Sequence, residues 1–139
     1  MTMSRLTQRI IEIKLRSELG FEKIPMAAVA ITAQKIGFDQ ERIDNLKMAV
    51  GEAVTNAIEH GNQFESELDV HIILTQKEKS LTIKVIDHAK RPIPPLSVER
   101  EERSDNRGWG MPLIKKFMDE VKTVARSRRN EIEMIAYLD

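Results

Sequence analysis

The stretch Val50-Gly51-Glu52-Ala53-Val54-Thr55-Asn56-Ala57-Ile58-Glu59-His60-Gly61-Asn62 decides the fold that this sequence predicts. It forms the second half of a segment, residues 40–60, whose apolar side chains repeat with helical spacing. When the segment is wound at about 100° per residue, one broad arc is entirely apolar and contains Ile43, Leu46, Val50, Ala53, Val54, Ala57 and Ile58. The segment therefore predicts a long helix with one buried face.

The opposite arc of this helix carries Glu52, Asn56 and Glu59, with His60 at its edge. These side chains share a face because residues three, four and seven apart stack along a helix. Gly61 follows and predicts a left-handed C-cap. The helix alone is also compatible with a polar face that is merely solvated.

Composition favours an ordinary globular protein. The 139 residues predict a single domain, 1–139, that can bury a core. The 22 Lys and Arg balance the 22 Asp and Glu, so net charge favours no polyanionic partner, and we expect no direct nucleic-acid binding. The lack of cysteine excludes disulfides and a cysteine nucleophile. With neither a signal-peptide pattern nor a membrane-length apolar run, we expect a cytoplasmic protein with no membrane contact.

Alternation of apolar and polar residues predicts strands before and after the two expected helices. A strand is expected at residues 9–16, and a hairpin at 68–74 and 81–85. The helix before the long one should cover residues 25–36, with Gly37 ending it and Asp39 capping the next. A helix at 108–120 and strands at 121–127 and 131–138 complete the chain. This order predicts an α+β fold, a mostly antiparallel sheet with helices on one face.

Residues 88–106 have little to bury, with Pro92, Pro94 and Pro95 followed by the charged run 99–103. A segment of this length inside a compact domain is typical either of a lid over a site or of a disordered loop. The charged run itself is typical of a solvated surface.

Three pieces of the chain form a spaced set of motifs: residues 52–61 of the long helix, the strand that ends in Asp87, and residues 107–114 with 118–121 beyond them. Together they resemble the nucleotide-binding boxes of the GHKL ATPase superfamily, and within it the chain is most similar to the anti-sigma factor serine kinases of the RsbW type. Residues 52–61 look like the N box of that family, and residues 107–114, with 118–121, are similar to its second glycine box and the following helix. The resemblance covers almost the whole chain and implies a two-layer α/β sandwich of the Bergerat ATP-binding type.

The resemblance implies roles for two residues of the long helix. Asn56 would be a ligand to Mg²⁺, for which a neutral amide oxygen is well suited. Asn is also a poor residue for the middle of a helix, which favours a functional reason for its presence. Glu52, one turn earlier, would be the general base that takes the proton from a substrate hydroxyl as it attacks the γ-phosphate of ATP.

The other nucleotide contacts implied by the resemblance lie further along the chain. Asp87 would accept the adenine amino group, although a strand-end turn residue is the alternative. Gly108 and Gly110 would bring backbone N–H groups to the phosphates at a helix N-terminus, or would form a plain turn into that helix. The remaining candidates for nucleotide contact are His60, Ala89, Arg107, Trp109 and Met111, of which Trp109 is also compatible with local packing or with a partner.

The first glycine box departs from the family pattern. Where the family has Asp-x-Gly-x-Gly, this chain has Asp87-His88-Ala89-Lys90-Arg91, so that Arg91 stands where a residue without a side chain is expected. The family also tends to have a threonine near the adenine-binding aspartate, and here Asn130 aligns with it, in the turn of the last hairpin. These changes affect nucleotide binding more than the fold.

Two functions follow as hypotheses. The first is an anti-sigma factor and protein-serine kinase that uses Mg-ATP to phosphorylate an anti-anti-sigma partner of the STAS type and thereby regulates transcription. The alternative, favoured by Arg91, is a catalytically degenerate GHKL module that holds a regulatory partner without phosphoryl transfer. Family members commonly dimerise, so a homodimer through exposed apolar residues of the first strand and helix is a further expectation.

Overall fold

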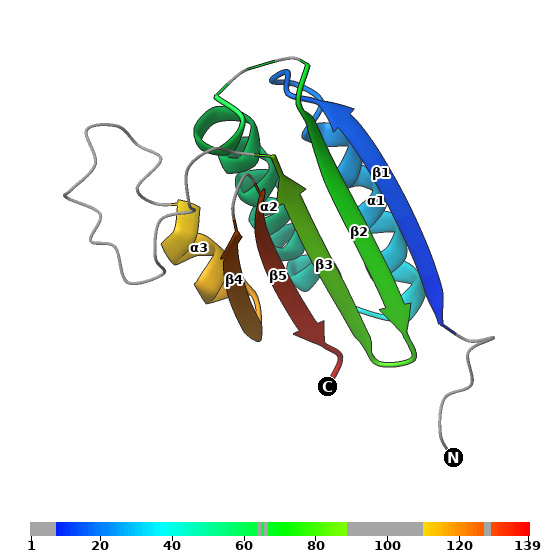
Figure 1. The fold of residues 1–139 in the computed structure, drawn as a ribbon. Helices are drawn as coiled ribbons and strands as arrows, with labels where there is room; N and C mark the ends of the chain where they lie inside the picture. Colours follow the sequence, from blue (N-terminus) through cyan, green and yellow to red (C-terminus); the bar gives the residue numbers. More distant parts are fainter. Residues whose placement is uncertain (1–7, 64, 66, 89–109, 127–128) are drawn as a thin grey trace.

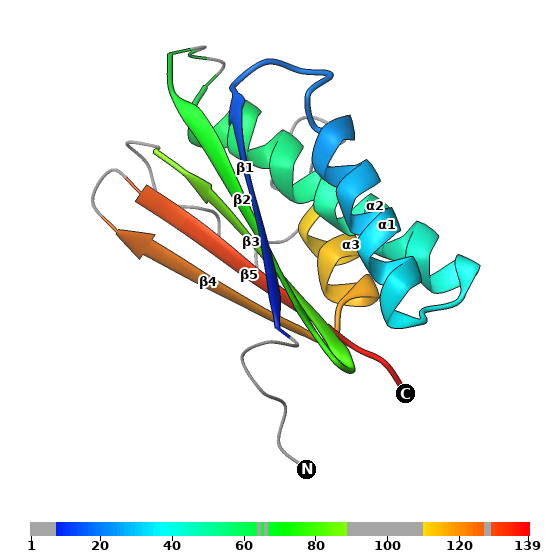
Figure 2. The same ribbon diagram turned by 90° about the vertical axis from the view of Figure 1, so that its right-hand side faces the viewer.

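The computed structural model describes residues 8–63, 65, 67–88, 110–126 and 129–139. Its element order is β1 (Arg9–Arg16), α1 (Lys23–Ile36), α2 (Gln40–Asn56), a π-helical turn η2 (Ala57–Gly61), β2 (Asp69–Lys77), β3 (Ser80–Asp87), α3 (Gly110–Phe117), β4 (Glu120–Arg126) and β5 (Arg129–Tyr137). The five strands form one antiparallel sheet in the order β1-β2-β3-β5-β4, and the three helices cover one of its faces (Figures 1 and 2). The predicted α+β two-layer architecture is confirmed.

The core lies between the sheet and α2, as the apolar arc of that helix predicts. All seven residues of the arc are buried, and four of them are completely inaccessible, Leu46, Val50, Val54 and Ile58. On the sheet they meet every second residue of the strands, because alternate side chains point to opposite faces. These residues include Val70, Ile72 and Leu74 of β2, Leu81, Ile83 and Val85 of β3, and Ile132, Met134 and Ala136 of β5.

Local signals in the sequence set the ends of the first two helices. Gly37 ends α1 in the left-handed conformation, with φ 117°, which a residue without a side chain adopts at little cost. The carboxylate of Asp39 then accepts the backbone N–H of Arg42 at 2.8 Å and caps α2. Both predictions are confirmed. Within the described ranges, no helix combines the length and apolar character needed to cross a membrane.

The predicted end of the chain needs two corrections. The helix α3 ends at Phe117 rather than near residue 120, because β4 already begins at Glu120. Asn130, predicted in the last turn, lies inside β5, where it pairs with Asp87 of β3. β5 begins at Arg129, earlier than the alternation of apolar residues predicted, because its pairing with β3 continues to Asn130 opposite Asp87.

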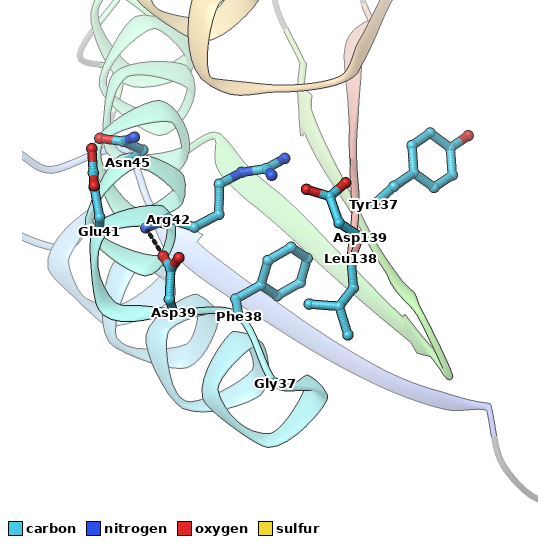
Figure 3. A pocket seen from close by; sticks show the side chains of 9 residues that line it. All are labelled: Gly37, Phe38, Asp39, Glu41, Arg42, Asn45, Tyr137, Leu138 and Asp139. Atoms are coloured by element: carbon cyan, nitrogen blue, oxygen red, sulfur yellow. Dashed lines mark hydrogen bonds between the residues drawn. The ribbon is translucent and has the colours of Figure 1, made fainter.

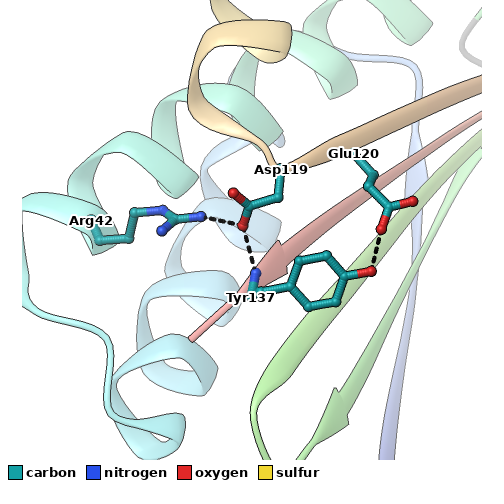
Figure 4. A network of polar contacts seen from close by, with 4 residues as sticks. All are labelled: Arg42, Asp119, Glu120 and Tyr137. Atoms are coloured by element: carbon teal, nitrogen blue, oxygen red, sulfur yellow. Dashed lines mark hydrogen bonds and ion pairs between the residues drawn. The ribbon is translucent and has the colours of Figure 1, made fainter. Parts of the chain in front are cut away.

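A polar network ties the start of α2 to the last hairpin (Figure 4). Asp119, between α3 and β4, accepts from the Arg42 guanidinium and from the backbone N–H of Tyr137, both at 2.7 Å. Burial acts to raise the pKa of Asp119, but the two hydrogen bonds and the charge of Arg42 outweigh it, so that this pKa is lowered. The Tyr137 hydroxyl donates to Glu120, and this hydrogen bond raises the pKa of the phenol.

Asp119→Asn should therefore destabilise the protein at neutral pH, and the loss should shrink as pH falls below the ordinary pKa of an aspartate. A lowered pKa means that the folded state favours the carboxylate, so its contribution is present above the ordinary value near 3.8 and is lost as pH falls through the folded value. Because the side chain is 41% exposed, solvent screening limits the effect to about 1 kcal/mol. Urea unfolding at pH 7 and pH 3 measures it. Glu133→Gln, which removes only a 3.9 Å pair with Lys84, is the control, and an equal loss in both variants would contradict the prediction.

Candidate functional site

The polar face of α2 lies at the C-terminal end of the helix, from which the chain continues through η2 to β2. Glu52 and Asn56 are half-buried, Glu59 is buried and His60 is exposed. Glu52, Asn56 and Glu59 follow one another at intervals of four and three residues, which places them in one row. The predicted clustering of these side chains on one helix face is thus compatible with the structure, and the row is only partly open to solvent.

Asn56 carries an unusual atom. Its Oδ1 is buried and has no hydrogen-bond partner among the described residues. A buried amide oxygen without a partner costs about 1–3 kcal/mol, so native structures hold few of them and each needs a reason. An oxygen of this kind fits a hard cation such as Mg²⁺, which would supply the missing interaction. Asn56 is therefore the described residue best suited to hold a metal ion.

The helix does not end as the sequence predicted. Gly61 was expected to be a left-handed C-cap, but the described glycines with positive φ are Gly20 and Gly37. Instead, α2 widens into the π-helical turn η2, closed by a 2.7 Å hydrogen bond from the N–H of Asn62 to the carbonyl of Ala57. Single π turns occur mostly inside α-helices and often at functional sites. The turn carries the chain from Asn56 to the end of β3.

Gly61 is required for close approach, and the residue it approaches is Asp87. A Cβ on Gly61 would lie 2.2 Å from Oδ2 and 2.5 Å from Cγ of Asp87, far inside van der Waals contact. Asp87 is only 4% exposed, and its Oδ1 accepts from Nδ2 of Asn130 at 3.1 Å. The carboxylate is therefore held between the end of the π turn and β5. The structure brings together Gly61, Asp87 and Asn130, from the end of η2, the end of β3 and the start of β5. Figure 1 shows that these three elements lie on the same side of the fold as the end of α2.

The second predicted box is described only in part. Gly110 is the first residue of α3, which packs against α2 and buries Met111 and Ile114, and Met118 directly after the helix is buried too. Met111 was proposed as a nucleotide contact, and the structure places it among the apolar core residues. The other candidates of this region, Ala89, Arg107, Gly108 and Trp109, lie outside the described residues, and so does Arg91.

One residue of this region had no predicted role. Asn62 follows Gly61 directly, is 1% exposed, and its Oδ1 accepts the backbone N–H of His88 at 2.9 Å. It thus connects the end of η2 to the residue after Asp87. The only sequence signal for it is its position next to the predicted helix end, because His88 lies 26 residues further along the chain.

A pocket at the other end of α2 is separate from these residues. It has a volume of about 330 Å³ and is lined by Gly37, Phe38, Asp39, Glu41, Arg42, Asn45, Tyr137, Leu138 and Asp139 (Figure 3). An α-helix rises about 1.5 Å per residue, so Asp39, at the start of α2, lies roughly 25 Å along the helix from Asn56. None of the predicted site residues lines it.

Comparisons with known proteins agree with the geometry. The model of the family described as histidine kinase-like ATPase domain matches residues 21–136. An anti-sigma F factor of Clostridium acetobutylicum is 32% identical over 117 residues, which cover 80% of each chain. A serine-protein kinase RsbW of Oceanobacillus iheyensis is 30% identical over 123 residues, covering 81% of this chain and 77% of the relative.

Solved structures support the same fold. The structure of the RsbU and RsbW domains of a Mycobacterium tuberculosis protein matches with a TM-score of 0.70 at 17% identity, covering 94% of this chain and 32% of that one. The histidine kinase domain of a blue-light activated kinase from Erythrobacter litoralis matches with a TM-score of 0.57 at 13% identity, covering 84% of this chain and 61% of that one. At these identities the likeness concerns the fold alone.

Proposed function

The chain belongs to the histidine kinase-like ATPase domain family, and from this premise we propose that it is an anti-sigma factor and protein-serine kinase that uses Mg-ATP. The names of two relatives, an anti-sigma F factor and a serine-protein kinase RsbW, support both parts of this function. Its phosphoryl acceptor would be a serine of an anti-anti-sigma protein of the STAS type. We propose that residues 1–139 act as one domain in the cytoplasm.

The single observation that carries the proposal is the buried Oδ1 of Asn56, which has no hydrogen-bond partner among the described residues. It supplies the one ligand that a magnesium ion needs from the protein when ATP phosphates and water provide the others. Bound there, the ion would neutralise phosphate charge. Glu52, one helical turn earlier, is the proposed general base for the attacking hydroxyl. Asp87 is the proposed acceptor for the adenine amino group, held in place by Gly61 and Asn130.

The other proposed nucleotide contacts surround this centre. The N-terminus of α3, which begins at Gly110, suits phosphate because its first N–H groups are free of intrahelical partners and the helix dipole favours anions there. His60 is exposed in η2, next to the polar face of α2, so its imidazole is accessible to a bound nucleotide. We also retain Ala89, Arg107, Gly108, Trp109 and Met111 as candidates.

Partner switching follows from the chemistry of the product. A phosphoserine adds nearly two negative charges to the surface of the anti-anti-sigma partner. A surface shaped for a neutral serine would then repel or desolvate that charge and release the partner. The kinase would be free to hold a sigma factor. A homodimer is part of the proposal, because β1 and α1 expose Ile10, Ile11, Ile24 and Ile31.

Asn56→Leu should separate stability from metal binding. Leucine has the same branching as asparagine, is a better helix former and removes a buried oxygen that has no partner in the described part of the chain, so we expect stability to be unchanged or to rise by about 1 kcal/mol. The same change should weaken ATP binding at least about tenfold in magnesium and remove its dependence on magnesium. Calorimetric titration and urea unfolding measure the two effects.

Asn45→Leu is the matched control for this experiment, since it makes the same substitution in the same helix at a half-buried position. It should leave ATP affinity unchanged. An Asn56→Leu protein that still binds ATP with the wild-type response to magnesium would show that Asn56 is not the metal ligand.

Transfer of label tests the kinase function itself. Each STAS-type protein encoded in the source genome is incubated with this chain, magnesium and ATP labelled on the γ-phosphate. We expect label on a serine of one of them, and none when magnesium is removed. If ATP is bound but no acceptor is labelled, the kinase proposal fails, and the alternative of a binding module without phosphoryl transfer takes its place.

A further inference from the structure

Asn62 is the centre of a buried polar cluster that joins three distant parts of the chain. Its Nδ2 donates to Oγ of Ser17 at 2.8 Å and to the backbone carbonyl of Asp69 at 3.1 Å. Its Oδ1 accepts the backbone N–H of His88 at 2.9 Å. Ser17, itself only 2% exposed, donates a hydrogen bond from its hydroxyl to the carbonyl of Leu68 at 2.6 Å. The cluster thus links the end of β1, the start of β2 and the end of β3.

The amide nitrogen and the amide oxygen of Asn62 bind different parts of the chain. The donor end is anchored on the sheet, through Ser17 and Asp69. The acceptor end holds the peptide that follows Asp87. The backbone N–H of Asn62 also closes the π turn on Ala57, so one residue fixes both the end of η2 and the exit of β3. Among residues of this size only asparagine offers an acceptor and a two-proton donor at once.

We infer that Asn62 is a positioning residue for nucleotide recognition, and this inference rests on the proposed function. Gly61 and Asn130 bound the Asp87 side chain on two sides, and the bond from Asn62 to His88 holds the backbone that carries it. Asn62 thereby keeps the base-recognising carboxylate at a fixed place relative to Asn56, six residues earlier on the same helical segment. Because Asn62 is only 1% exposed, its proposed effect on the nucleotide passes through Asp87.

Three variants separate positioning from mere stability. Asn62→Ala removes both ends of the amide. Ser17→Ala disturbs the same buried cluster only at the donor end, while the Asn62 donor keeps the carbonyl of Asp69. Asn62→Asp keeps an acceptor for the N–H of His88 and is the conservative variant. For each folded variant we would measure hydrogen exchange of the His88 amide without ligand, the dissociation constant for Mg-ATP and the free energy of unfolding.

Asn62→Ala should speed exchange of the His88 amide and weaken ATP binding, each by about tenfold or more, because a buried hydrogen bond is lost. Ser17→Ala should lose stability but keep His88 exchange and ATP affinity within about twofold of wild type. Asn62→Asp keeps the acceptor for His88 but turns a carboxylate oxygen toward the carbonyl of Asp69, so it should lose stability, and its ATP affinity should follow the exchange of the His88 amide. The inference is overturned if Asn62→Ala keeps wild-type exchange and affinity, or if Ser17→Ala weakens ATP binding as much.

Failure of the proposed function gives a different result. Wild-type protein that binds no ATP refutes the nucleotide site whatever the variants do. The exchange of His88 in the unliganded variants still decides whether Asn62 holds this peptide. If Asn62→Ala does not fold, Asn62→Asp decides the inference, because loss of ATP affinity while the His88 amide still exchanges slowly contradicts it.

Discussion

Glu52→Gln is expected to lower phosphoryl transfer by about 10²–10⁴-fold while ATP binding stays close to wild type. The amide has the shape of the carboxylate and cannot accept the proton of the attacking hydroxyl. Glu52 lies half-buried on the polar face of α2, one turn before Asn56, so the substitution changes a proton acceptor and leaves the proposed metal ligand in place. The rate of label transfer to the STAS-type partner, and the ATP dissociation constant from calorimetry, measure the two quantities.

Glu41→Gln is the control for this prediction. Glu41 is an exposed acidic residue in the first turn of the same helix, and its substitution should change neither quantity. Full transfer activity in Glu52→Gln would exclude Glu52 as the base. A loss of ATP binding in the same variant would assign it to the binding site instead.

Gly61→Ala is expected to abolish ATP binding in a protein that still folds. The new methyl group would overlap the Asp87 carboxylate, which cannot simply rotate away because it is buried and bonded to Asn130. Overpacking of this kind typically costs about 1–3 kcal/mol of stability. The backbone of Gly61 is not left-handed, so alanine can adopt its conformation without strain. Any loss of ATP binding therefore reports the overlap between the new methyl group and Asp87. ATP titration and thermal unfolding provide the measurements.

Gly51→Ala is the matched control, a glycine-to-alanine change ten residues earlier in the same helical segment. Its Cβ would meet Sδ of Met26 at 2.8 Å, but that atom is near the tip of a flexible side chain that can move aside. This variant should bind ATP normally. Equal loss of binding in both variants would mean that the helix, and not the Asp87 contact, is responsible. Normal ATP binding by Gly61→Ala would contradict the proposed role of Asp87.

The parts of the fold that depend on local signals could be predicted from the sequence. The apolar arc of α2 is buried throughout, and Asp39 and Gly37 cap and end the helices as expected. Helical and strand periodicity arises from which side chains share a face, and a single segment contains that information. The matching family model and the solved structures agree with the fold that these signals, together with the resemblance, implied.

The arrangement around Asp87 could not be predicted in the same way. Gly61 was assigned a capping role because a glycine after a helix usually has one. Its real constraint is the carboxylate of Asp87, which is 26 residues away in the sequence. Asn130 and Asn62 show the same limit, since the bond partners of each come from other strands or their ends. Contacts between residues so far apart in the chain produce no repeating pattern that a single sequence could show.

The central claim is that this chain binds ATP through magnesium, and calorimetric titration of the wild-type protein with ATP tests it most directly. The titration is carried out twice, with magnesium in excess and with EDTA, after circular dichroism has shown that the protein is folded. We predict saturable binding at one site per chain in magnesium and a loss of at least about tenfold in affinity with EDTA, as expected when a charged ligand loses the cation that pairs it with the protein. No binding at millimolar ATP in the presence of magnesium would contradict the account.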